Sequence, residues 1–246
     1  MTKRETGLLA LVLMLAAIVL HVGHYLIFRD FHQLSFYFLL DVAFLPVNVL
    51  VLTLLVDRLL NERERAGRRH KMNMVVGVFF TELGRPLLSL LRDLLPPEQA
   101  SLAQLQITAQ TTPRQIMRLA ETAATLPLEI VLETRDLAAL KALLDEHEEL
   151  TLRLLANPAL LEHEEFTDVL WAVVHLGEEL SARQSFENLP APDIAHLQGD
   201  TLRVYSRLLR QWLQYLAHLQ QYYPYLYSFA VRADPLHPGG PVEVTE

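Results

Sequence analysis

The chain has 246 residues, a net charge of −8, 51% hydrophobic residues and no cysteine. Without cysteine there can be no disulfide, no thiolate metal site and no cysteine nucleophile. The charge is divided unevenly, because residues 1–71 carry a net +3 and residues 72–246 carry a net −11. An acidic domain opposes nucleic-acid phosphates, so we expect no nucleic-acid partner.

The chain begins with two apolar segments, residues 7–28 and 35–56. As helices of 22 residues each they would be about 33 Å long, enough to cross a hydrocarbon core of about 30 Å. Only residues 29–34 separate them, so the pattern predicts a two-helix transmembrane hairpin over residues 1–56. A cleaved signal peptide is the alternative for the first segment, but the apolar run is long and no small-x-small cleavage site follows it.

Basic residues predict the orientation of this hairpin. The N-terminus carries Lys3 and Arg4, the connecting loop carries only Arg29, and a dense basic run follows the second span. Lys and Arg near span ends stay on the cytoplasmic side, so both termini are expected there. Residues 57–71 are expected to form a juxtamembrane helix that contacts anionic lipid headgroups through Arg58, Arg63, Arg65, Arg68, Arg69 and Lys71.

The rest of the chain predicts an all-α fold, with a cytoplasmic helical bundle over residues 72–234 and a flexible tail over 235–246. Glycine is scarce, strand-like alternation is absent, and strong helix formers dominate. Prolines and caps place the helices at about 57–95 (kinked or ended early at Pro86), 97–110, 112–125, 134–156, 162–187 and 193–222.

Two apolar stripes indicate how this bundle packs. In the last long helix the core positions recur at helical spacing, as Leu197, Leu202, Tyr205, Leu208, Leu209, Trp212, Leu216 and Leu219. Residues 72–95 are apolar nearly all round, which favours a central helix, a helix at the membrane surface or an oligomer seam. Charged residues inside this segment, among them Glu82 and Arg85, argue against a third span.

Polar residues inside the predicted spans form the first candidate site: His21, His24, Asp41 and Asn48. Counted from the span ends, His24 and Asp41 lie at similar depths, so a hydrogen bond between them is expected. The alternatives are a structural pair that locks the hairpin, or an ion or proton path in which Asp41 repeats around an oligomer.

A second candidate site combines two His/carboxylate pairs of the cytoplasmic domain. His175 and Glu179 stand four residues apart on one helix, as do His196 and Asp200 on the next. Such pairs on facing helices can bind iron, manganese or zinc, but a set of interhelical hydrogen bonds and surface carboxylates is the preferred explanation. The Glu-x-x-His motif of di-iron bundles, phosphate-binding loops and nucleophile elbows are all absent from the sequence. No cofactor is therefore predicted beyond this possible metal ion.

Three stretches carry a resemblance: the ten residues from Asp41 (DVAFLPVNVL), the thirteen from Met72 (MNMVVGVFFTELG), and Tyr223-Pro-Tyr-Leu. They resemble a family of bacterial inner-membrane proteins with two N-terminal spans and a helical cytoplasmic region. The resemblance implies a location in the bacterial inner membrane. It carries no assigned activity, so no catalytic residue can be transferred.

Together these observations predict a non-enzymatic, oligomeric inner-membrane protein that acts as a scaffold or interaction module. The expected partners are the lipid bilayer, further copies of the chain and a possible cytoplasmic protein. One alternative is a small ion channel with Asp41 and Asn48 facing a pore. The other is a membrane-tethered metal enzyme that uses His175, Glu179, His196 and Asp200.

Overall fold

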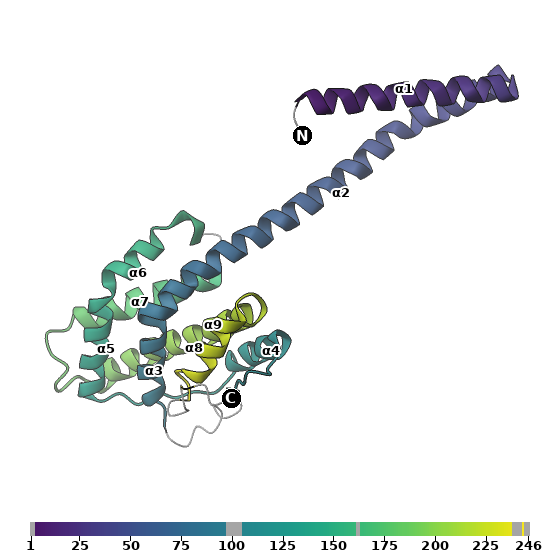
Figure 1. Cartoon of the computed structure of the whole chain (residues 1–246). Helices are drawn as coiled ribbons and strands as arrows, with labels where there is room; N and C mark the ends of the chain where they lie inside the picture. Colours follow the sequence, from purple (N-terminus) through teal and green to yellow (C-terminus); the bar gives the residue numbers. More distant parts are fainter. Residues whose placement is uncertain (1–2, 97–104, 161–162, 238–242, 244–246) are drawn as a thin grey trace. The chain divides into compact units, whose positions relative to one another are not determined.

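The structure is a computed structural model that describes residues 3–96, 105–160, 163–237 and 243, with the side chains of residues 61–71 and 159 also outside the description. The described residues form helices joined by turns and contain no strand, which confirms the all-α fold (Figure 1). The chain divides into two compact units, Met1–Arg65 and Ala66–Glu246.

The first unit is a helical hairpin with a very short connection. It consists of α1 (Lys3–Phe28) and the first part of α2 (Phe31–Phe79). Arg29 has a φ of 49° at the turn, and the Asp30 carboxylate accepts hydrogen bonds from the backbone N–H groups of His32 (2.9 Å) and Gln33 (3.1 Å). This N-cap starts α2 at residue 31, four residues before the predicted span.

Three segments are long and apolar enough to cross a membrane: Arg4–Phe28, Phe31–Leu60 and Met72–Asp93. None of the most apolar 18-residue window is buried in the first two, whereas 44% of it is buried in the third. The third segment therefore buries part of its apolar surface within the second unit, as expected for a helix of the domain.

The third segment is not one regular helix. α2 ends at Phe79, a π-helical turn, η1, spans Phe80–Gly84, and α3 follows over Arg85–Asp93. Pro86 stands in the first turn of α3, where its missing N–H costs little. The kink predicted at Pro86 is thus replaced by a π turn that begins six residues earlier.

The second unit continues with α4 and its neighbours, and several bounds differ from the prediction. Its elements are α4 (Pro113–Ala123), α5 (Thr134–Glu146), α6 (Glu148–Leu155), η3 (Pro158–Leu160), α7 (Glu164–Ser181), α8 (Ala191–Tyr222) and α9 (Pro224–Arg232). The helix predicted over 134–156 breaks at His147, whose ring bonds the Leu143 carbonyl at 2.9 Å. α9 was not predicted.

Two further expectations are wrong in part. Of the short helix predicted over 97–110, residues 97–104 lie outside the described part, and residues 106–110 are not helical. The tail predicted from residue 235 begins inside the fold, because Leu236 is buried and the Arg92 guanidinium donates to the Pro235 carbonyl at 2.7 Å. Residues 238–242 and 244–246 lie outside the description.

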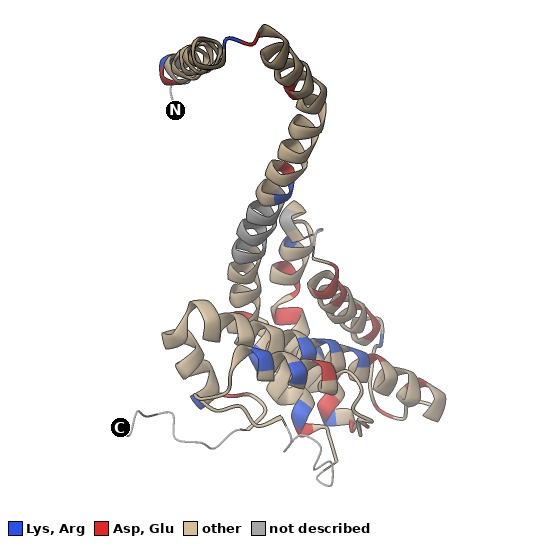
Figure 2. Cartoon of the chain, turned by 90° about the vertical axis from the view of Figure 1, so that its right-hand side faces the viewer, with Lys and Arg blue, Asp and Glu red and all other residues tan. Residues whose placement is uncertain are grey.

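Helix α8 is the centre of the second unit. It packs against α3, α4, α7, α9 and η1. The predicted stripe along it is confirmed as core, since each member is buried except Leu202, which is partly buried against the same cluster. Charged side chains gather on the helices of this unit and are sparse on α1 and on residues 31–56 of α2 (Figure 2).

Candidate functional site

The polar residues of the hairpin do not pair as predicted. The His21 ring bonds the Ala17 carbonyl at 2.9 Å and lies edge-on to Phe38. The His24 ring lies against Phe28, and its Nδ1 is buried with no hydrogen-bond partner in the described residues. A hollow of about 210 Å³ between the helices is lined by Leu20, His21, His24, Leu34, Tyr37 and Phe38.

The register of the hairpin explains why His24 misses Asp41. His24 lies four residues before the end of α1, whereas Asp41 lies ten residues into α2 because that helix begins at Phe31. Six residues of helix are about 9 Å, so the two side chains differ in depth. Asp41 and Asn48 are both exposed on α2. Among the predicted headgroup-contacting residues, Arg58 is described and exposed, while the side chains of Arg63, Arg65, Arg68, Arg69 and Lys71 lie outside the description.

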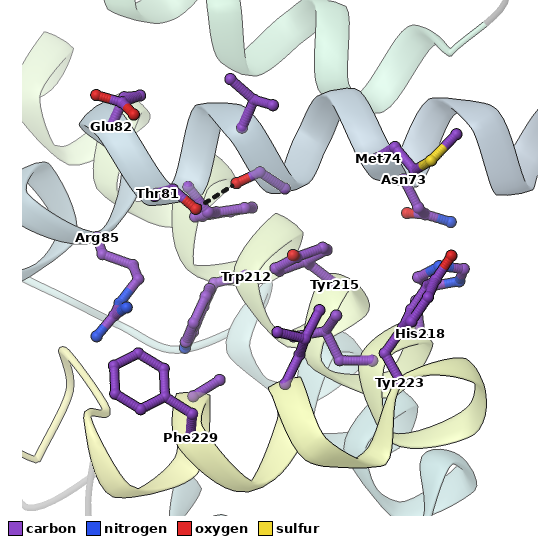
Figure 3. A pocket seen from close by; sticks show the side chains of 16 residues that line it. Asn73, Met74, Thr81, Glu82, Arg85, Trp212, Tyr215, His218, Tyr223 and Phe229 are labelled. Carbon is purple, nitrogen blue, oxygen red and sulfur yellow. Dashed lines mark hydrogen bonds between the residues drawn. The ribbon is translucent and has the colours of Figure 1, made fainter. Parts of the chain in front are cut away.

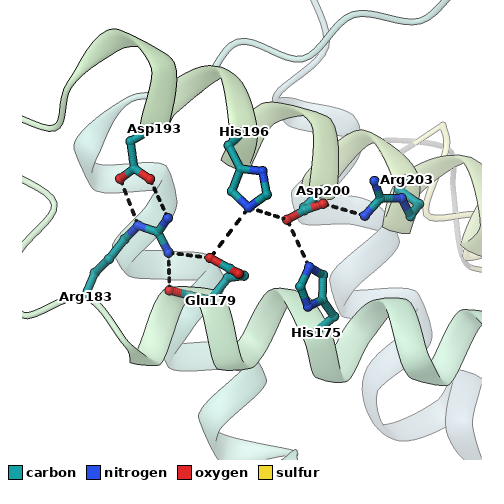
Figure 4. A network of polar contacts seen from close by, with 7 residues as sticks. All are labelled: His175, Glu179, Arg183, Asp193, His196, Asp200 and Arg203. Carbon is teal, nitrogen blue, oxygen red and sulfur yellow. Dashed lines mark hydrogen bonds and ion pairs between the residues drawn. The ribbon is translucent and has the colours of Figure 1, made fainter.

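The four residues predicted to hold a metal do come together between α7 and α8 (Figure 4). Asp200 is 3% exposed, and its Oδ2 lies 3.3 Å from Nε2 of both His175 and His196. Glu179 approaches from α7, with its Oε2 3.7 Å from His196 Nε2. Arg203 pairs with the other oxygen of Asp200.

Arg183 extends this network beyond Glu179. It binds Asp193 through two nitrogens and Glu179 through a third, whose Nη1–Oε2 distance is 2.9 Å. The hydrogen bond from Arg183 holds the pKa of both carboxyl groups below their ordinary values. Its hydrogen bonds to the Asp193 carboxylate in turn raise the pKa of Arg183. The α7–α8 network is therefore His175, Glu179, Arg183, Asp193, His196, Asp200 and Arg203.

The α7–α8 network connects the two helices through ion pairs. Three carboxylates meet two guanidinium groups and two imidazoles in it. Among the described residues no group of three or more His, Asp or Glu is placed to hold a metal ion.

Sequence reasoning missed a serine–lysine contact on the neighbouring helices. Lys141 Nζ lies 2.8 Å from Ser181 Oγ and 2.6 Å from Asp145, and Ser181 also donates to Asp145 at 3.0 Å. The hydrogen bond from Lys141 lowers the pKa of Asp145. An ammonium that donates to both groups has no lone pair with which to activate the serine. The 40-residue separation gave no signal in the sequence.

Sequence reasoning also missed a pocket in the second unit (Figure 3). It holds about 540 Å³ between residues 73–85, α8 and α9, within the size range of small-molecule sites. Phe80 forms its inner wall, stacked on Tyr215 with 5.4 Å between ring centroids and tilted against Trp212 at 5.1 Å. Gly77 lets the Tyr215 hydroxyl approach, since a Cβ there would lie 2.7 Å from it.

Arg85 brings a positive charge to this aromatic pocket. Its Nη2 donates to the Ala233 carbonyl at 2.7 Å, and its guanidinium carbon lies 5.5 Å from the centre of the Phe229 ring. Burial lowers the pKa of Arg85, and the nearby Asp234 carboxylate acts in the opposite direction. Its Nε is buried and makes no hydrogen bond within the described chain.

Comparison with known proteins places the whole chain in one family. The family described as "Uncharacterized protein MJ1433, C-terminal helical domain" matches residues 68–232, and its counterpart, "MJ1433, N-terminal helical domain", matches residues 2–60. The chain belongs to the MJ1433 family. The relative that carries this name, from Methanocaldococcus jannaschii, is 39% identical over 234 residues, which are 95% of this chain and 94% of the relative.

The family match agrees with the division of the chain into an N-terminal and a C-terminal helical part. The boundary between the two matched regions falls between residues 60 and 68, close to the division of the structure at Arg65. The relative is archaeal, so it does not bear on the bacterial origin expected from the resemblance. No solved structure matches the chain.

Proposed function

We propose that this protein is a membrane-anchored, non-enzymatic helical module that assembles with itself or with a cytoplasmic protein. The observation that carries the proposal is that none of the apolar windows in Arg4–Phe28 and Phe31–Leu60 is buried within the described chain. Side chains of this kind are stable in hydrocarbon and unfavourable in water. Burying a fully exposed Leu or Phe side chain contributes about 1.5–3 kcal/mol of transfer free energy, which is lost when the side chain stays in water. A bilayer is the surrounding that accounts for them.

Asp41 supports the assembly part of the proposal. It is exposed on an otherwise apolar stretch of α2, and a carboxylate inside a bilayer faces a partner helix or water. A second copy of the hairpin would supply such a partner. The basic residues that flank the hairpin favour cytoplasmic termini.

Cysteine labelling tests the anchor and its orientation. Because the chain lacks cysteine, Gln33→Cys, near the connection, and Thr125→Cys, on the surface of the second unit, each create one thiol without background. In spheroplasts of the expression host, a membrane-impermeant maleimide should label the Gln33→Cys protein. The Thr125→Cys protein should be labelled only after permeabilisation. Recovery of the protein in the soluble fraction would overturn the anchor.

The assembly is tested by light scattering of the detergent-solubilised full chain. A mass of two or more copies per complex, reduced by Asp41→Leu, would support self-association through the hairpin. A monomer over a hundredfold range of protein concentration would overturn it. Asn48→Leu, which alters an exposed polar residue two turns further along α2, is the matched control.

The exposure of Asp41 also favours a second candidate function, a small ion-conducting assembly. Rings of carboxylates select cations in channels, and Asp41 repeated around an axis would form such a ring. Potassium flux from liposomes that contain the full chain tests it, with Asp41→Ala as the comparison. Absence of flux in the unmodified protein would end this candidate.

A further inference from the structure

We infer that the pocket between residues 73–85, α8 and α9 binds a small amphiphile that carries a single carboxylate on an apolar body, with Arg85 holding the carboxylate. This ligand class goes beyond the proposed anchoring and assembly and does not depend on them. The inference rests on the composition of the walls, on the state of Arg85 and on the charges around it.

The walls are suited to an apolar body. The rings of Phe80 and Trp212 are buried behind the pocket, and Tyr215, stacked on Phe80, is the partly exposed ring of this cluster. The rim continues the apolar lining with Met74, Val78 and Phe229, which are each about half exposed although they are large and apolar. Apolar side chains that water reaches on every side of a pocket gain free energy when a ligand covers them.

Arg85 is suited to an anionic head. A guanidinium has five N–H donors, and within the described residues the only hydrogen bond of Arg85 is the one from Nη2 to Ala233. Its ring contact with Phe229 and its partial burial remove water from the remaining donors. A desolvated guanidinium with unused donors is a favourable site for a carboxylate, which it can bind through two parallel hydrogen bonds.

The surrounding charges select a monoanion. Arg85 is the one Lys or Arg among the described residues that line the pocket, and Glu82 lines it as well. The Asp234 carboxylate also acts on Arg85. Because two carboxylates stand near this one positive charge, the surroundings are already negative overall, so a doubly charged phosphate head would be repelled more strongly than a single carboxylate that bonds directly to the guanidinium.

Figure 3 shows how these groups lie. Arg85, Trp212 and Phe229 stand together at one end of the pocket, and Asn73, Met74 and His218 stand at the other. A ligand with its carboxylate on Arg85 would therefore lay its apolar body along the wall toward Tyr215. This placement brings the apolar body within quenching range of Trp212.

The chain offers a built-in reporter for this ligand. It has two tryptophans, Trp212 in the pocket wall and Trp171 on the exposed surface of α7. The Trp171→Phe variant leaves Trp212 as the single fluorophore. The full chain carrying this change is placed in nanodiscs of zwitterionic lipid and titrated with dodecanoate brominated on its chain, because bromine quenches tryptophan at contact range.

We expect saturable quenching by the carboxylate and a dissociation constant about tenfold higher in Arg85→Gln, the loss of one charged hydrogen-bond partner. The uncharged methyl ester of the same acid should bind with equal affinity whether or not the Arg85→Gln change is present. Brominated dodecyl phosphate should bind more weakly than the carboxylate. Arg118→Gln, which removes an exposed cation of α4 outside the pocket, should leave the titration unchanged.

Three results would overturn the inference: quenching that does not saturate, equal affinity for acid and ester, or an Arg85→Gln titration that matches the unmodified protein. A phosphate that binds more tightly than the carboxylate would also overturn it, in favour of a lipid phosphate head. Should Arg85→Gln fail to fold, Arg85→Lys keeps the charge without the planar fork, and its dissociation constant should rise about threefold.

Discussion

Phe44 in the first part of α2 exposes 54% of its surface, whereas Phe79 at the end of the same helix exposes none. The same contrast separates the two units, since the large apolar side chains of the hairpin are exposed and most of those of the second unit form one core. Residue type alone therefore does not decide burial. The hairpin takes its apolar surroundings from outside the chain, and the second unit makes its own.

The largest expected effect is a loss of stability when a core ring of the second unit is removed. Phe79→Ala removes a ring that packs against Phe80 and Phe166, so we expect the second unit to lose about 3–5 kcal/mol of unfolding free energy. Chemical denaturation followed by Trp212 fluorescence measures the loss. Phe44→Ala, the same change on an exposed position, should shift the transition by less than about 0.5 kcal/mol. Similar losses for both variants would contradict the contrast.

A second test compares two aspartates of the same unit. Asp200→Asn removes the buried charge on which His175, His196 and Arg203 converge, and should cost about 1–3 kcal/mol of unfolding free energy. Asp168→Asn breaks an exposed pair with Arg207 at 3.9 Å and should cost less than about 0.5 kcal/mol. An Asp200→Asn protein as stable as its parent would show that the α7–α8 network does not hold the helices together.

Two glycines of the second unit allow the same comparison of buried and open positions with a single added methyl group. A Cβ at Gly84 would meet the buried rings of Phe80 at 2.5 Å and Phe79 at 2.9 Å, so Gly84→Ala should destabilise the second unit by about 1–2 kcal/mol. At Gly199 on α8 a Cβ would meet nothing within 4 Å. Gly199→Ala should therefore stabilise by up to about 1 kcal/mol through helix propensity. Thermal denaturation of the two variants checks both signs.

The smallest expected effect is a change in thermal stability at acidic pH. Arg183 lowers the folded-state pKa of Glu179 and Asp193, so the stability they contribute is present above their ordinary pKa values near 4. It is lost as the pH falls through the lowered folded values. We expect the difference in Tm between the parent and Arg183→Gln to narrow from pH 7 to pH 3. A constant difference over that range would contradict this assignment.

The sequence predicted the helical class, the hairpin and the α8 stripe because each depends on local periodicity. Leu208, Trp212 and Leu216 recur on one helical face, and this spacing is visible without any tertiary contact. The four predicted metal residues also converge, since the i, i+4 spacing puts each pair on one face of its helix and the fold turns these two faces toward each other.

What the sequence missed depends on contacts between distant segments or on small shifts of register. The His24–Asp41 bond fails because the Asp30 cap starts α2 four residues early. The pocket requires Phe80 to stack on Tyr215, 135 positions later, and nothing in either local sequence marks the pair. The π turn over Phe80–Gly84 was likewise hidden, since its apolar spacing matches an ordinary helix.

The connection between α1 and α2 consists of Arg29 and Asp30 alone. In a membrane-crossing hairpin with cytoplasmic ends, these two residues and the first turn of α2 would be all that the hairpin presents to the opposite compartment. A soluble molecule on that side would find no domain to recognise there. Any information that such a hairpin gathered would come from the lipid around it, from neighbouring spans or from the cytoplasm.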